Sequence, residues 1–328
     1  MAEKNMATAK RQKSAFRIWV EYIPVWLLYQ FVHLLPLKVA YRLIRGIFGV
    51  MFYFDRKHRV RTVQHLMHAG VAPDERSARR MAKRVYKNFG MLFAEIVKMD
   101  QLFSVDKIRM VGDPESIRRL TAGPVEQRQN VIITTGHYGN WEVAGTAFAA
   151  FTGLPMTSLM RPFGNPLIGE LILHGRRSKI HELVDKSGGI RPVLRALKAH
   201  RTVALLVDQH ASRGEGVETV FFGQPCRTHT SPALLHLKTG IPILPQLTRR
   251  CGDNFEFELV VGKMIEYQPT GDREHDVRVI AQQYTSAFEE MVRQDPEQWM
   301  WAHRRWLNIN RKSTASAAVE NADSAVVK

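Results

Sequence analysis

A histidine and a glutamate five positions apart are the residues of this sequence whose types and setting best fit catalysis. His137 and Glu142 lie in the stretch VIITTGHYGNWE, where a short β-branched run ends at Thr135 and Gly136 and Gly139 permit a sharp turn. His137 is therefore expected just beyond the carboxyl end of a strand, where α/β folds place their ligands. A carboxylate bound to one imidazole nitrogen fixes the tautomer and raises the basicity of the other nitrogen.

The chemistry that this pair predicts is removal of a proton from a substrate hydroxyl. On a continuous helix, five positions would separate the two side chains by about 140°, but across a glycine-containing turn they can face each other. The turn carries no serine or cysteine, so it does not match the nucleophile turn of a hydrolase. A general base without an enzyme nucleophile favours direct attack by a substrate hydroxyl. The alternative is a purely structural histidine–glutamate pair.

Strands and helices alternate from about residue 113 onward, which predicts an α/β domain with helices flanking a central, mostly parallel sheet. The expected strands are 131–135, 156–160, 202–207, 217–222, 241–247 and 255–261, and the expected helices are 141–151, 165–179, 192–200 and 272–293. His137 is then positioned by the first of these strands and by the helix that follows it.

The amino-terminal part of the chain combines apolar runs with basic flanks. Residues 22–37 form an uncharged run, shorter than the roughly 20 apolar residues that a spanning helix needs. A second apolar patch covers 47–54, and cations lie on both sides of these runs, whereas a spanning segment usually has a lopsided basic flank. We expect a helical segment embedded in one leaflet and facing the cytoplasm. A buried core helix and a single membrane span are the alternatives.

Residues 74–98 are expected to form one amphipathic helix with a basic outer face. The formal net charge of +16 must attract an anionic partner, which composition alone does not identify. The basic face is either a solvated surface or a docking stripe for phosphates or an acidic protein. We find no recognised nucleic-acid module, so nucleic acid is not an expected partner. The cations of this stripe are Arg76, Arg79, Arg80, Lys83, Arg84 and Lys87.

Composition and patterning divide the chain into four parts. We expect a membrane-anchoring segment at 1–60, a helical region at 61–112, the α/β domain at 113–311 and a disordered tail of small and polar residues at 312–328. The cysteines and histidines show no metal-ligand spacing, so neither a metal nor a cofactor is expected. Trp299, Trp301 and Trp306 fit either a core aromatic cluster or a membrane-interface belt.

The stretch GHYGNWE resembles the signature of the lipid A late acyltransferases, the lauroyl and myristoyl transferases of Gram-negative bacteria. These belong to the glycerolipid acyltransferase superfamily, whose catalytic motif is a histidine followed by four residues and an acid. Further segments resemble family segments in the same order, although Gln64-His65-Leu66 stands where the family usually has an Asn-Leu pair. The matching segments are Arg161-Pro162 with Asn165-Pro166, Asp208-Gln209-His210 followed by Phe221-Phe222-Gly223, and Pro296-Glu297-Gln298-Trp299 followed by His303-Arg304-Arg305-Trp306.

The resemblance implies a role for each residue of the motif. His137 would be the general base and Glu142 its orienting partner, and the acceptor hydroxyl would attack a thioester carbonyl and expel a thiol. Backbone N–H groups near Gly139 and Asn140, at a helix start, are the expected donors to the tetrahedral oxyanion.

Three side chains after later strands are expected at the same cleft. Arg161 would hold the oxyanion or a phosphate, and a surface salt bridge is its alternative role. Asp208 and Gln209 follow another strand end and are expected to line the cleft, with a structural cap as the alternative for Asp208.

The function implied by the resemblance is transfer of a fatty acyl chain to a hydroxyl of a lipid A precursor at the cytoplasmic face of the bacterial inner membrane. The basic charge favours a donor carried on acyl carrier protein over acyl-coenzyme A. The expected partners are therefore this donor, an anionic lipid acceptor and the membrane surface. A lysophospholipid or aminolipid acyltransferase, a basic nucleic-acid-binding protein and a catalytically dead membrane scaffold are the rival interpretations.

Overall fold

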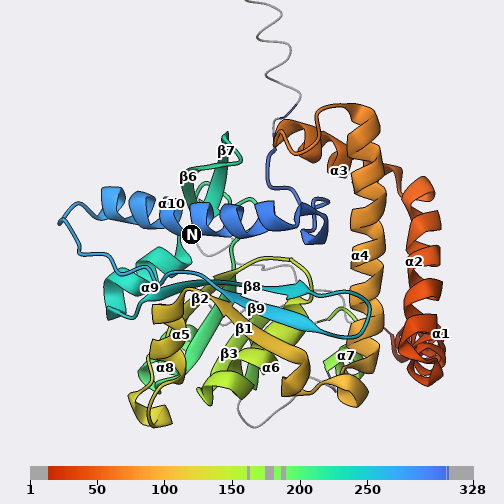
Figure 1. The fold of residues 1–328 in the computed structure, drawn as a ribbon, viewed down its shortest axis with the longest axis horizontal. Coiled ribbons are helices and arrows are strands. Elements are labelled where there is room, and N and C mark those ends of the chain that lie inside the picture. The colour runs from red at the N-terminus through yellow and green to blue at the C-terminus, as the bar shows by residue number, and fades with distance from the viewer. Residues whose placement is uncertain (1–13, 161–162, 174–180, 186–189, 308, 310–328) are drawn as a thin grey trace, which may run out of the picture.

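A seven-stranded sheet forms the centre of the computed structural model, which describes residues 14–160, 163–173, 181–185, 190–307 and 309 (Figure 1). The strand order is β1-β9-β8-β2-β5-β3-β4, and every neighbouring pair is parallel except β8 and β9. This confirms the predicted α/β class with a mostly parallel sheet. The strands are β1 (Ile108–Gly112), β2 (Ile132–Thr135), β3 (Met156–Met160), β4 (His181–Asp185), β5 (Thr202–Leu206), β8 (Ile243–Arg250) and β9 (Phe257–Val261).

Helices cover both faces of the sheet because its central strands are apolar on both sides. Ile133 packs in a cluster with Val143 and Phe148 of α6 (Trp141–Thr152). Its neighbour Ile132 points the opposite way, as successive strand residues must, and packs with α8 (Ile190–Lys198), α9 (Ser231–Thr239) and α10 (Arg273–Gln294). The short helix α5 (Pro114–Thr121) lies beside α6.

The register of two central strands decides which loops meet. In the parallel pair β2 and β5, Thr135 lies opposite Leu206. Both strands end at these residues, so the segments that begin at Gly136 and Val207 leave the same edge of the sheet together. This register brings His137 and Asp208 side by side.

Four helices from the amino-terminal part stand against one side of this domain (Figure 1). They are α1 (Ala15–Leu34), α2 (Leu37–Phe54), α3 (Arg56–His68) and α4 (Glu75–Leu102). Tyr41 and Ile44 of α2 are buried against Met91 and Ala94 of α4. Within the residues that the structure describes, no helix has the length and hydropathy needed to cross a bilayer.

Several elements differ from the sequence expectation. The residues of 217–222 do form a strand, but β6 (Gly216–Phe221) pairs with β7 (Gln224–His229) in a separate hairpin over α10. The predicted helix 165–179 is α7 (Pro166–Leu173) in its described part. β1 precedes the expected start of the α/β domain at residue 113, and the tail at 312–328 lies outside the described residues.

Candidate active site

The turn that carries His137 is held on both sides by backbone hydrogen bonds. The N–H of Met300 donates to the carbonyl oxygen of His137 at 2.9 Å, and the N–H of Gly139 donates to the carbonyl oxygen of Gln298 at 3.0 Å. Gly139 has a φ of +53°, and a Cβ at this position would lie 1.9 Å from the carbonyl oxygen of Thr248. Only glycine fits, because both the conformation and the space exclude a side chain.

The imidazole of His137 is bound by Asp208. Its Nδ1 lies 3.0 Å from Oδ1 of Asp208, and its backbone N–H donates to Oδ2 at 2.9 Å. The indole Nε1 of Trp299 donates to the same Oδ2 at 3.0 Å. The Asp208 side chain is fully buried, and the His137 side chain is 19% exposed. A buried carboxylate with three N–H partners is well compensated for its loss of hydration.

These contacts settle the charge and the tautomer. Burial would raise the pKa of Asp208, but the charge and the hydrogen bonds of His137, with the charge of His303, outweigh burial and hold that pKa well below its ordinary value. Asp208 is therefore ionised at neutral pH and can only accept hydrogen bonds. Nδ1 of His137 therefore carries a hydrogen, and in the neutral tautomer the lone pair lies on Nε2.

Glu142 lies on the first turn of α6 and lines the same cavity as His137. The sequence analysis predicts that Glu142 orients the imidazole, and that role stays a prediction. At Nδ1 the hydrogen bonds come from Asp208. Local structure explains where the two carboxylates lie. Asn140 caps α6, with its Oδ1 accepting from the N–H groups of Glu142 and Val143, while the β2–β5 register delivers Asp208 directly to the ring.

A second histidine, His303, lies against the ring of His137. The rings of His137 and His303 are 4.3 Å apart between centroids, and Nε2 of Gln209 lies 3.4 Å from Nε2 of His303. Burial, followed by the charge of His137, lowers the pKa of His303 to about 4, so this ring is neutral at neutral pH. Trp141 stands edge-on to His137 on another side, at 5.0 Å between ring centroids.

Arg305 holds the segment around Asp208 through hydrogen bonds to its backbone. Its side chain is buried, and its Nη1 contacts the carbonyl oxygens of Val207 and Gln209, while Nη2 donates to Oγ1 of Thr228 at 2.8 Å. The three tryptophans of the same carboxyl-terminal segment are at most 5% exposed. They therefore belong to the core, and the interpretation as a membrane-interface belt is wrong.

A cavity of about 370 Å³ opens beside His137, between the sheet and α6. About half of its lining is polar, and these residues are Thr135, His137, Glu142, Ser158, His181, Gln209, His229 and Gln246. The apolar half comes from β2, β3, β4, β5 and α6. The apolar lining residues are Ile133, Ala144, Gly145, Met156, Leu159, Leu183, Ala204 and Leu206.

The other residues expected to contact substrate are Gly139, Asn140, Gln209 and Arg161. The N–H groups of Gly139 and Asn140 donate to the carbonyl oxygens of Gln298 and Thr248 in this structure, so they hold the turn rather than face the cavity as oxyanion donors. Gln209 lines the cavity as expected. Arg161 lies outside the described residues.

The sequence interpretation missed Trp299 and His303 as neighbours of the catalytic turn. Both fall in the carboxyl-terminal segments that matched the family, so the signal was present as a motif. Their contact with Asp208 and His137 depends on how that segment folds back against β8, through the bridge between Tyr138 and Trp299.

An imidazole held by a buried carboxylate at the strand ends of an α/β sheet, beside a cavity with polar and apolar walls, has the geometry of an enzyme active site that uses a general base. Comparison with known proteins narrows this class. The sequence profile described as bacterial lipid A biosynthesis acyltransferase matches residues 6–308, and the chain belongs to that family.

Three relatives share between 23% and 28% of the aligned residues with this chain. The chain is 28% identical over 180 residues to a phosphatidylinositol mannoside acyltransferase of Mycobacterium tuberculosis, an alignment that covers 54% of each chain. It is 25% identical over 292 residues to the lipid A biosynthesis lauroyltransferase of Escherichia coli, with 88% of this chain and 92% of the relative aligned. The palmitoleoyltransferase of the same organism is 23% identical over 235 residues, covering 71% and 74%. The chain thus spans about half the length of the mycobacterial relative.

Proposed function

We propose that this protein transfers a fatty acyl chain from a thioester to a hydroxyl of a lipid A precursor or a related membrane lipid. The observation that carries the proposal is the Asp208–His137 pair beside a cavity whose lining is about half apolar. Membership of the lipid A acyltransferase family supports it. The names of the relatives include both lipid A and phosphatidylinositol mannoside acyltransferases, which favours a lipid acceptor of either kind.

The proposed reaction needs one proton carrier. Nε2 of His137 takes the proton of the acceptor hydroxyl as its oxygen attacks the thioester carbonyl carbon. The tetrahedral intermediate then collapses, the carbon–sulfur bond breaks, and the leaving thiolate takes the proton back from Nε2. Asp208 keeps Nδ1 protonated and stabilises the imidazolium that exists between the two steps.

The other residues at the cavity act on charge and position. Glu142 adds a second carboxylate near the ring, which also favours the imidazolium. The side-chain amide of Gln209 is a donor for the oxyanion in place of the engaged N–H groups of Gly139 and Asn140. Arg161 keeps its proposed role as the cation for the oxyanion or a phosphate. The acyl chain lies in the apolar part of the cavity.

The proposed donor is an acyl thioester on the acidic acyl carrier protein. In the basic face of α4, Arg79 pairs with Glu75, and Arg84 pairs with Glu297. Lys83 and Lys87 instead line a groove of about 480 Å³ together with cations from α2. This groove is lined by Arg42, Arg45, Gly46, Gly49, Val50, Tyr53, Lys83 and Lys87, and it is the part of the stripe that best suits an acidic protein surface.

We further propose that α1 docks the protein on the membrane. Val32 is its buried residue, whereas large apolar side chains along its length are exposed. An exposed apolar surface of this extent needs a lipid or protein partner. Apolar side chains occur all around α1 and not on one face alone. Basic residues in the chain suit an anionic leaflet. The exposed residues are Phe16, Trp19, Val20, Ile23, Trp26, Leu27, Leu28, Phe31 and Leu34.

Mass spectrometry of the reaction products tests the proposed function. Purified protein is offered the same acyl group on carrier protein and on coenzyme A, each with a panel of lipid A precursors, lysophospholipids and aminolipids. An acylated lipid A precursor formed from the carrier-protein donor is the expected result. Acylation of a lysophospholipid or aminolipid alone would replace the acceptor, and no transfer to any lipid would overturn the proposal.

A further inference from the structure

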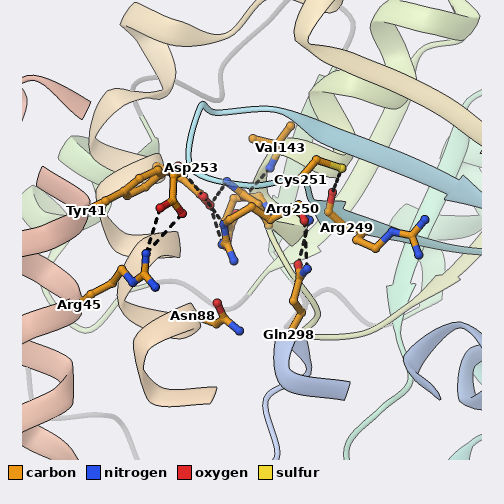
Figure 2. A network of polar contacts seen from close by, with 12 residues as sticks. Tyr41, Arg45, Asn88, Val143, Arg249, Arg250, Cys251, Asp253 and Gln298 are labelled. Atoms are coloured by element: carbon orange, nitrogen blue, oxygen red, sulfur yellow. Dashed lines mark hydrogen bonds and ion pairs between the residues drawn. The ribbon is translucent and has the colours of Figure 1, made fainter. Parts of the chain in front are cut away.

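A buried carboxylate on α4 is bound by side chains from three other elements. Glu95 is fully buried, and its Oε1 accepts from the hydroxyl of Tyr41 at 2.8 Å and from Nε of Arg250. Its Oε2 accepts from Nη2 of Arg250 at 2.8 Å and from Nδ2 of Asn140 at 2.9 Å. Figure 2 shows Arg250 at the centre of these contacts, with Tyr41 on one side and Gln298 on the other. Both carboxylate oxygens are thus occupied twice.

The contact with Asn140 reaches the active-site turn. The Asn140 side chain is fully buried, and its Oδ1 caps α6 by accepting from the N–H groups of Glu142 and Val143 at 3.0 and 2.9 Å. An amide turned by 180° would present its NH2 group to those N–H groups and its oxygen to Glu95, and both contacts would be repulsive. Glu95 therefore fixes the orientation of the amide that starts α6.

The start of α6 matters because it carries two side chains of the cavity. Trp141 and Glu142 are its first residues, and both line the cavity with His137. On the far side of the network, Gln298 accepts from the N–H of Arg250 at 2.8 Å and donates to its carbonyl oxygen at 3.0 Å. The carbonyl of Gln298 in turn binds the N–H of Gly139. The network thus forms hydrogen bonds with the turn at Gly139 and at Asn140.

We propose that Glu95 is a positioning residue for the active site, which sets the turn and the start of α6 through Asn140 and shares this anchor with α2 through Tyr41. The inference rests on the proposed acyl transfer for its kinetic consequence. Its geometric part concerns only the placement of His137, Trp141 and Glu142. A network that served stability alone would have no reason to affect turnover well below the unfolding temperature.

A reciprocal exchange tests the contact. Asn140→Asp keeps a capping oxygen but sets a second carboxylate against Glu95, and Glu95→Gln allows the Asn140 amide to turn. The double variant exchanges acid and amide across the same hydrogen bond, because the new amide on α4 would donate to the new carboxylate at the cap while the buried charge is conserved. We expect each single variant to lose about 10-fold or more in kcat. The double variant should lose clearly less than the product of the two single losses, since the amide–carboxylate bond is restored although Nη2 of Arg250 loses its acceptor at Oε2.

Two further variants give the test an alternative to Glu95→Gln and a control. Asn140→Ser keeps a cap without the bond to Glu95, and it covers the case in which Glu95→Gln leaves Arg250 uncompensated and does not fold. Asp272→Ser alters the cap of α10, where Asp272 accepts from two N–H groups in the same way. This control is expected to change the thermal midpoint and not kcat.

The imidazole NMR signals of His137, assigned with His137→Ala, give a readout that needs no substrate. We expect them to shift in the single variants and in Asn140→Ser, and to return in the double variant. Unchanged signals and kcat in Asn140→Asp, or a double variant no better than the product of its singles, would overturn the inference. Absence of lipid transfer by the wild-type protein would instead contradict the proposed function, and the NMR signals would still decide on the positioning role.

Discussion

Asp208 holds Nδ1 of His137 at 3.0 Å although the two residues are 71 positions apart in the chain. The contact exists because β2 and β5 are parallel neighbours that end together. It makes the proposed general base a pair formed across two strands, whereas the sequence interpretation had placed both members in one turn.

The first prediction concerns the two carboxylates near His137. We expect His137→Ala and Asp208→Asn each to lower kcat by a factor on the order of 10²–10⁴, because the first removes the base and the second removes the charge that stabilises the imidazolium. Glu142→Gln should lower kcat less than Asp208→Asn, and less than Glu142→Ala. Steady-state kinetics with circular dichroism as a check of folding measures this.

The ranking separates the two assignments. A Glu142→Gln loss larger than the Asp208→Asn loss would return the orienting role to Glu142. Trp299→Phe is a useful companion, since it removes one hydrogen bond to Asp208 and keeps an aromatic ring in the core. We expect a smaller loss of kcat from it than from Asp208→Asn.

The fold was predictable to the extent that its signals are local. The buried runs at β2 and β5 correctly predicted strands, and the glycine turn correctly placed His137 just beyond the end of one of them. β4, with the sequence HELVD, and β7, with QPCRTH, were missed because their polar residues and Pro225 hide the strand pattern. Their structure comes from pairing with β3 and β6.

The site was predictable only in part, for a related reason. Asp208 was expected at the cleft from its place after a strand, but its partner depends on strand register. The N–H groups of Gly139 and Asn140 looked available from local geometry. They are engaged because β8 and the segment after α10 pack against the turn, and no local pattern reports such contacts.

The second prediction concerns α1. We expect Trp19→Ser, Leu27→Ser and Phe31→Ser together to move the protein from the membrane pellet to the supernatant, because these side chains are each more than half exposed and bind lipid on the proposed docking. Val220→Ser with Leu307→Ser, at exposed apolar residues elsewhere, is the control and should stay with the membrane.

Sedimentation in low and high salt completes this experiment. High salt should weaken binding of the wild-type protein without abolishing it, since salt screens charge and does not weaken apolar burial. Release of the wild-type protein by salt alone would rule out an embedded apolar helix. Substitution is preferable to deletion up to residue 60, because α2 contributes Tyr41 and Ile44 to the core with α4.

The third prediction concerns the donor. We expect Arg42→Glu with Lys87→Glu to reduce kcat/KM for the carrier-protein donor at least about 10-fold at low salt and to affect the coenzyme A donor little, because opposed charge mainly speeds encounter. Discontinuous assays at several salt concentrations measure kcat/KM for each donor. The control, Arg191→Glu with Arg278→Glu, makes the same charge change at exposed residues of α8 and α10. Equal losses for both donors would exclude a carrier-protein surface in the groove.

The fourth prediction concerns stability below neutral pH. Burial lowers the pKa of His65 to about 4, and that of His303 is also about 4, against about 6.5 in an unfolded chain. The unfolded state therefore binds more protons between these values. The two rings therefore cost no stability above pH 6.5. As the pH drops from 6.5 toward 4, the free energy of unfolding falls by up to about 1.4 kcal/mol per pH unit for each ring.

Chemical denaturation at pH 7.5, 6 and 5 checks this dependence. His65→Asn removes one titrating ring while its amide can still donate to the carbonyl oxygen of Trp301, which Nδ1 now contacts at 2.9 Å. We expect a flatter pH dependence from it. His275→Asn, at an exposed histidine of α10, should leave the slope as in wild type, and a slope unchanged in both variants would disprove the role of His65.

The hydrogen bond from Trp299 to Asp208 can form only late in synthesis, because Trp299 lies 91 positions after Asp208 in the chain. Synthesis proceeds from the amino end, so α1 and α2 leave the ribosome long before the segment around Trp299 and Met300. On the proposed docking, the growing chain can reach the bilayer while Asp208 still lacks its indole partner and the His137 turn lacks its backbone bond from Met300. Membrane binding would thus precede assembly of the active site. A chain released early by the ribosome would remain on the membrane without activity.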